Sequence, residues 1–127
     1  VVWRKEYRTD SGGVGAYRGG LGQVIEVETA IGADLELLAA FDRINHPPRG
    51  RACGGDGEAG SVKLGSGAPL RGKGTQIVRA GERLIIHTPG GAGYGDAGAR
   101  APEAILSDME NGLVSNTRAR IDYGINY

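Results

Sequence analysis

Two glycine-rich stretches of this 127-residue sequence, residues 8–22 and 87–96, carry the side chains best suited to chemistry. Their candidate binding residues are Asp10, Ser11, Arg18, His87, Tyr94 and Asp96. A guanidinium and the backbone N–H groups of a glycine loop together bind carboxylate or phosphate groups. We therefore expect these residues to contact a substrate or a partner protein, while the sequence identifies no catalytic residue.

Arg18 lies between two glycine-rich turns, and turns alone do not require an arginine with acids nearby. One interpretation is an internal ion pair with Asp10 or Asp96 that braces the loops. The other is that Arg18 binds an anionic group of a substrate or partner, because its planar fork holds carboxylates bidentately. The sequence leaves both open.

Nucleophilic catalysis has weak support. Ser11 beside Asp10 is more typical of a turn or cap than of a catalytic triad. Cys53 needs a neighbouring base, and His46 is close to it only in sequence. Zinc needs about four ligands, so Cys53 and the two histidines form no metal motif. His87, next to Thr88, is expected to orient the glycine loop or to reach a shared active site.

Two motifs resemble those of nucleotide-binding sites, but the sequence around each of them does not fit such a site. Residues 93–98 spell G-x-G-x-x-G, but no second apolar strand with an acid follows at the distance a dinucleotide site needs. Residues 67–74 resemble a P-loop, yet Gly74 replaces the hydroxyl residue and a strand-like run follows instead of a helix. We predict no cofactor and no metal bound by this chain.

The elements that position these residues are mainly short strands, indicated by alternating apolar residues. The expected strands are Val1–Arg8, Gln23–Thr29, Val62–Leu64, Thr75–Arg79 and Arg83–Thr88. Residues 80–82 predict a hairpin link between the last two. Residues 34–43 fit either a helix, by composition, or a strand, by alternation, and we choose the strand. Residues 45–60 are expected to form a long loop.

The tail has helical signals. Pro102 suits the first position of a helix, Ile105 and Met109 share its apolar stripe, and Gly112 suits its end. Ser115 then caps a second short helix, which ends near Gly124. The prediction is a mainly β (α+β) fold of five or six mostly antiparallel strands. Residues 1–100 form the β part and residues 101–127 a helical pair packed on it, as one domain.

Composition narrows the class of protein. The 24 glycines are about a fifth of the chain, against a usual share of roughly 7%. The charges cancel, so the sequence has no basic patch for nucleic acid. No apolar run approaches the roughly 18 residues that span a bilayer, and no signal peptide opens the chain. With one cysteine, a cytoplasmic location is expected.

Three longer motifs carry a family resemblance. Residues 10–22 resemble the "DSGGxGxxRGGxG" signature of the hydantoinase B family, residues 88–96 its "TPGGGGYGD" segment, and residues 111–115 its "DGLVS" segment. The family includes part of 5-oxoprolinase and the large subunits of acetone and acetophenone carboxylases. The motifs occur in the family's order along nearly the whole chain. Asn111 departs from the usual aspartate.

The resemblance implies that this chain is the C-terminal segment, or a split-off small subunit, of a much longer B-type protein. It further implies an ATP-binding partner of the hydantoinase A type, the remaining B portion, and ATP and a divalent metal held in those parts. The expected function is scaffold and loop contacts in an ATP-dependent amidohydrolase or carboxylase complex, inactive alone. The alternatives are a purely structural interaction module and an independent small binding protein.

Overall fold

Six strands and two helices make up the computed structural model, which describes residues 1–125. A four-stranded antiparallel sheet has the order β1-β2-β6-β4, and a second sheet pairs β3 with β5. The strands are β1 (Val2–Tyr7), β2 (Gln23–Val27), β3 (Leu35–Ala40), β4 (Ser61–Leu64), β5 (Lys73–Val78) and β6 (Leu84–His87). The mainly β fold with a helical pair is confirmed.

Residues 34–43 contain a strand rather than a helix. Leu35, Leu37 and Ala39 of β3 turn inward and the residues between them are exposed, as the alternation predicts. A helix would have spread these leucines around its axis and exposed part of the apolar surface. The choice of strand is confirmed.

One apolar core lies between the two sheets. Val62 of β4, Val78 of β5 and Leu84 of β6 are buried together, with Val27 and Leu35 among the side chains packed around them. Because β5 pairs only with β3, the turn at residues 80–82 links two sheets and is not a hairpin. That prediction is wrong. The turn itself is present, with Gly81 at φ 83° and Glu82 N donating to the Arg79 carbonyl.

The helices form a second, smaller core. Helix α1 (Pro102–Glu110) starts at Pro102, and α2 (Asn116–Tyr123) is capped by the Ser115 hydroxyl, which accepts a hydrogen bond from Arg118 N. Ile105, Val114 and Ala119 are buried between them. Gly112 and Gly124 adopt the positive φ that helix ends favour. Both predicted helices and their ends are confirmed.

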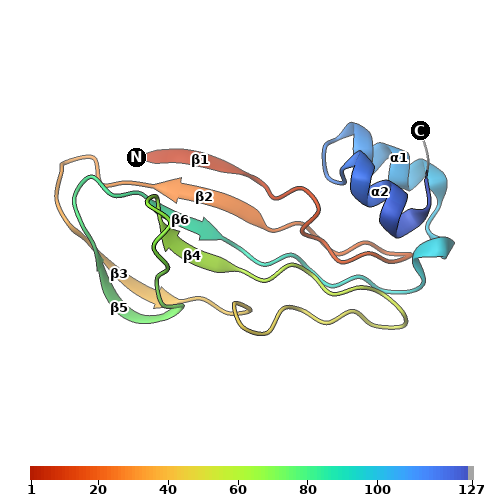
Figure 1. Cartoon of the computed structure of the whole chain (residues 1–127), viewed down its shortest axis with the longest axis horizontal. Coiled ribbons are helices and arrows are strands. Elements are labelled where there is room, and N and C mark those ends of the chain that lie inside the picture. The colour runs from red at the N-terminus through yellow and green to blue at the C-terminus, as the bar shows by residue number, and fades with distance from the viewer. Residues whose placement is uncertain (126–127) are drawn as a thin grey trace.

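Between these two cores runs the glycine bundle, defined as residues 11–22, 48–60 and 88–96. In Figure 1 the strands lie at one end of an elongated molecule, the helices at the other, and long segments run side by side between them. Backbone hydrogen bonds join the segments, for example Gly13 N to Gly91 O, Gly55 N to Val14 O and Gly93 N to Gly55 O. The bundle is therefore held by peptide groups rather than by a side-chain core.

Close backbone contact explains why the bundle needs glycine. A Cβ on Gly13 would overlap Gly55 O and one on Gly93 would overlap Val14 O, both main-chain atoms that cannot move aside. Glycine is thus required by space at these positions, since neither has a positive φ. The short segment η1 (Ala97–Ala99) then leads from the bundle to α1.

Candidate functional site

Arg18 is tied to α1 and not to the acids expected from the sequence. Its Nε donates to Asp108 Oδ2 at 2.9 Å and its Nη2 to Asp108 Oδ1 at 3.0 Å, a bidentate pair across 90 residues. A third bond joins Nη1 to the Gly19 carbonyl at 2.7 Å. The predicted pairing with Asp10 or Asp96 is wrong, whereas the bracing of the glycine loop by an internal ion pair is observed.

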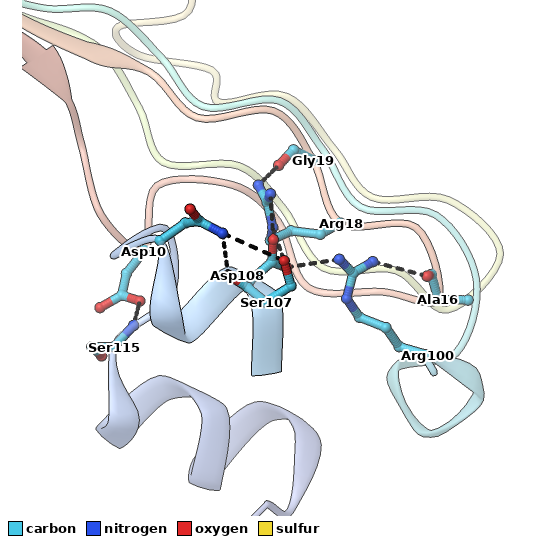
Figure 2. Close-up of polar contacts among 9 residues, drawn as sticks. Asp10, Ala16, Arg18, Gly19, Arg100, Ser107, Asp108 and Ser115 are labelled. Atoms are coloured by element: carbon cyan, nitrogen blue, oxygen red, sulfur yellow. Dashed lines mark hydrogen bonds and ion pairs between the residues drawn. The ribbon is translucent and has the colours of Figure 1, made fainter. Parts of the chain in front are cut away.

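A second arginine holds the same carboxylate. Arg100 Nη2 donates to Asp108 Oδ2 at 2.7 Å, and Arg100 Nη1 donates to the Ala16 carbonyl at 3.1 Å. We call Arg18, Arg100 and Asp108 the arginine clamp; Figure 2 shows both guanidinium groups turned toward the one carboxylate. The three side chains are only 10–14% exposed. The clamp therefore fastens the glycine bundle to the helical pair.

Electrostatics favours the ionised form of Asp108. Burial by itself would raise the pKa of Asp108, but the hydrogen bonds and charges of Arg18 and Arg100 outweigh it and lower that pKa below its usual value. A charged carboxylate in this position strengthens all three hydrogen bonds from the two arginines, because charge-assisted hydrogen bonds are stronger than neutral ones.

Asp10 and Ser11 each bond to the backbone of the chain. Asp10 adopts φ 67°, and its Oδ1 accepts a hydrogen bond from Ser115 N at 2.8 Å, so it supports the start of α2. In Figure 2 its carboxylate turns to Ser115. The Ser11 side chain is buried; its hydroxyl donates to the Arg8 carbonyl and accepts from Gly22 N. Both partners are backbone groups, so the hydroxyl has the bonding of a turn serine.

Asp96 and Tyr94 lie farther along the bundle. Asp96 is exposed and caps η1, accepting a hydrogen bond from Gly98 N at 2.7 Å. Tyr94 is 56% exposed and its ring lies 6.3 Å from that of Tyr17, which is 73% exposed. Reciprocal backbone bonds hold the two tyrosines side by side. The backbone of Arg51 lies beside the two tyrosines, because Gly95 N donates a hydrogen bond to the Arg51 carbonyl.

His87 stands apart from the other candidates, within β6 opposite Val24 and Ser61. Burial, followed by the positive charges of Arg8 and Lys63, lowers the pKa of its imidazole. His87 is therefore neutral near pH 7. Its neighbour Thr88 makes the contacts to the loop, accepting from Gln23 N and from Arg8 Nη1.

The six candidates thus fall into three places rather than one pocket. Asp10 and Arg18 line a small cavity of about 10 Å³ with Asp122 and Tyr123, and Ser11 follows Asp10 in the chain. Tyr94 and Asp96 lie at the far turn of the bundle, and His87 lies in the sheet. Within residues 1–125, no three His, Cys, Asp or Glu side chains are grouped as metal ligands are. No described helix is long and apolar enough to cross a membrane.

Sequence reasoning missed Asp108 and Arg100. A signal for Asp108 was available, because it follows Ile105 by three residues and so lies on the buried stripe of α1. A carboxylate on such a stripe needs a cationic partner. Arg100 had no comparable signal, since nothing in its local sequence indicates burial.

Comparison with known proteins gives a match to the hydantoinase B/oxoprolinase family model over residues 1–97. The chain is 34% identical to the beta subunit of caprolactamase from Pseudomonas jessenii, aligned over 98% of this chain and 23% of that protein. The chain spans only 22% of the length of one curated relative and 23% of the length of another.

Two solved structures have the same fold. An ATP-dependent caprolactamase from Pseudomonas jessenii superposes with a TM-score of 0.79 at 29% identity, covering 100% of this chain and 23% of that one. An acetone carboxylase structure gives a TM-score of 0.60 at 20% identity, covering 99% of this chain and 21% of that one. At that identity, the second similarity concerns the fold alone.

Proposed function

Because this chain belongs to the hydantoinase B/oxoprolinase family, we propose that it acts as the C-terminal segment, or a split-off small subunit, of a B-type protein. In this role it serves an ATP-dependent amidohydrolase complex. The observation that carries the proposal is the alignment of 98% of this chain with under a quarter of the caprolactamase beta subunit. This proportion is expected if the chain corresponds to one part of a larger subunit.

Hydrolysis of a cyclic amide is favoured over carboxylation. The relatives by sequence include the beta subunit of a caprolactamase and the B subunit of a putative D-/L-hydantoinase, at 34% and 31% identity. The acetone carboxylase shares the fold at 20% identity. A hydantoinase A-type subunit that binds ATP, and a divalent metal held outside this chain, complete the proposed complex.

The role of this chain in the complex is scaffolding with loop contacts. The glycine bundle is a rigid arm, because its segments touch through main-chain atoms. The exposed Tyr17 and Tyr94 are presented on that arm beside Arg51. Tyrosine and arginine are enriched among residues that dominate protein interfaces. We assign Tyr94 and Asp96 to contact with substrate or partner, and Arg18, Asp10 and Ser11 to holding the arm in shape.

The test uses the caprolactamase beta subunit from which the segment matching this chain has been deleted, together with its partner subunit. We expect the isolated chain to show no ATPase or amidase activity, and the addition of this chain to restore lactam-dependent ATP hydrolysis to the truncated complex. Turnover by the pure chain would overturn the scaffold role. A chain that neither binds nor restores the truncated complex would overturn membership in such a complex.

A purely structural interaction module is the second candidate, since every candidate residue except Tyr94 makes a side-chain hydrogen bond within residues 1–125 or lies within the sheet. A Tyr94→Ala variant separates the two. If Tyr94 contacts substrate, the restored complex keeps its assembly and loses rate. If the chain only holds its neighbours together, the rate follows assembly alone.

A further inference from the structure

The two edges of the four-stranded sheet differ. The outer edge of β4 is covered by residues 65–70, since Leu64 N donates to Ala68 O and Leu70 N donates to Val62 O. At the opposite edge, β1 pairs with β2 and, among residues 1–125, with no further strand. All six residues of β1 are exposed. Large apolar side chains are among them, with Val2 at 63%, Trp3 at 54% and Tyr7 at 64%.

The hydrogen-bond pattern between β1 and β2 identifies the backbone groups of β1 that face away from β2. Arg8 N donates to the Gly22 carbonyl, so its peptide group faces β2. Because successive residues of a strand face opposite sides, Glu6 and Arg4 also face β2 while Lys5 and Tyr7 face outward. The irregularity between Val2 and Arg4 ends this pattern at Trp3. Lys5 and Tyr7 thus present unpaired N–H and C=O groups at the bare edge.

The charges of β1 argue against the pairing of its free edge with β1 of a second copy of this chain. In an antiparallel pairing of two β1 strands centred on Lys5 or on Glu6, that residue would lie opposite the same residue of the second copy. Like charges directly opposite each other destabilise a strand pair, and an edge lysine commonly prevents self-association. The exposed apolar residues on either side of Lys5 nevertheless leave a surface that needs cover.

We infer that β1 is a docking edge for a strand from the remaining portion of a hydantoinase B-type protein. This inference rests on the proposed function. The relatives hold more than three quarters of their length outside the part that matches this chain, which supplies the occupant. The incoming strand bonds to the outward groups of Lys5 and Tyr7 and covers the apolar side chains of β1.

The experiment measures binding to the Pseudomonas jessenii caprolactamase beta subunit that lacks the segment matching this chain. Lys5→Pro removes an outward N–H and leaves the β1–β2 bonds in place, because proline is tolerated on edge strands at such positions. Lys5→Ala is the matched control, since it removes the same side chain and keeps the N–H. We expect Lys5→Pro to weaken binding by roughly tenfold or more relative to Lys5→Ala, the loss expected for one interface hydrogen bond and its register.

Amide hydrogen exchange of the unaltered chain provides a second measurement if Lys5→Pro does not fold. The Lys5 and Tyr7 amides should exchange freely in the isolated chain and become protected in the complex, while those of Arg4 and Glu6 are protected in both. Equal binding by both Lys5 variants, or no new protection at Lys5 and Tyr7, overturns the docking edge and leaves the proposed function intact. Failure of the unaltered chain to bind overturns both. Protection that rises with the concentration of the chain alone identifies a second copy and overturns the assigned occupant.

Discussion

Asp108 joins the helical pair to two arginines outside it. It accepts hydrogen bonds from Arg18 and Arg100 with a side chain that is 10% exposed. We expect Asp108→Asn to lower the free energy of unfolding by about 3 kcal/mol, the low end for breaking a buried pair, because the amide oxygen still accepts one bond. Urea unfolding measures the loss.

The matched control is Asp34→Asn. Asp34 also pairs with an arginine, Arg79, at 2.8 Å, but the Arg79 side chain is 76% exposed. Exposed pairs contribute little to stability, so the urea midpoint of this variant should stay at that of the unaltered chain. If Asp108→Asn does not fold, Arg18→Lys keeps the charge, loses the bidentate fork, and should cost roughly 1–3 kcal/mol. A loss no larger than that of Asp34→Asn would contradict the role of the clamp.

Acid should remove the stabilisation that ionised Asp108 contributes through the arginine clamp. The folded-state pKa of Asp108 lies below the ordinary value of 3.8, so the folded protein holds this carboxylate ionised more strongly than the unfolded chain does. The stabilisation is therefore complete well above pH 3.8 and is lost as the pH falls through that value toward the folded-state pKa. We expect the difference in unfolding free energy between the unaltered chain and Asp108→Asn to shrink between about pH 6 and about pH 3. A difference independent of pH would show that the clamp does not act through ionisation.

Prediction from sequence worked for residues whose role is local. The cap at Ser115 and the glycine at position 112 follow from short-range hydrogen bonding, and both are found as expected. The sequence pointed to acids within the two glycine-rich stretches, Asp10 and Asp96, whereas the observed partner is an acid of α1, 90 residues from Arg18. The sequence indicated that Arg18 braces a loop; only the folded chain identifies the acid.

At the scale of elements, the glycine bundle makes a sharp prediction. Gly90→Ala would place a Cβ onto the Ser11 carbonyl oxygen, a main-chain atom. Gly20 lies in the same bundle with nothing within 4 Å of its Cβ position, and neither residue has a positive φ. We expect Gly90→Ala to destabilise by about 1–3 kcal/mol, as overpacking does. Gly20→Ala should be neutral or stabilising by about 0.5 kcal/mol, because it restricts the unfolded chain.

Thermal unfolding of the two alanine variants checks this prediction. Their difference isolates the space around the glycine, since both exchange the same atoms and lose the same backbone freedom. Equal melting temperatures for Gly90→Ala and Gly20→Ala would mean that the bundle segments separate easily, and the view of a rigid arm would then be wrong.

The strands themselves were well predicted because alternation is a local property. Residues 34–43 illustrate this, since the inward side chains of β3 are those the alternation selected. The turn at residues 80–82 was predicted correctly, because a turn depends on local sequence. The predicted hairpin was wrong, because the pairing partner of a strand depends on residues far away in the sequence. β5 pairs with β3, and β6 pairs with β2 and β4, while Val62, Val78 and Leu84 pack together between the two sheets.

At the scale of the whole molecule, two apolar cores lie at opposite ends of a bundle that has no side-chain core. Val62, Val78 and Leu84 form one, and Ile105, Val114 and Ala119 form the other. Backbone hydrogen bonds, the arginine clamp and the side-chain bonds of Thr9 to Gly112 O and of Asp10 to Ser115 N connect the bundle to the helices. Whether residues 1–100 and 101–127 behave as one domain, as predicted from sequence, therefore depends on those polar links.

The chain carries natural reporters at both ends. Trp3, the single tryptophan, lies at the strand end under the Arg83 guanidinium, 4.4 Å from the ring centre. The helices supply the circular dichroism at about 222 nm. If the chain is one cooperative unit, both signals should change at one urea midpoint, as in two-state unfolding.

In Asp108→Asn the helical signal should be lost at lower urea than the tryptophan signal, because that variant weakens the link to the helices and leaves the sheet core in place. Asp34→Asn should keep the two transitions together. Separate transitions in the unaltered chain would show that the helical pair melts alone, and coincident transitions in Asp108→Asn would show that the remaining hydrogen bonds suffice to couple the two cores.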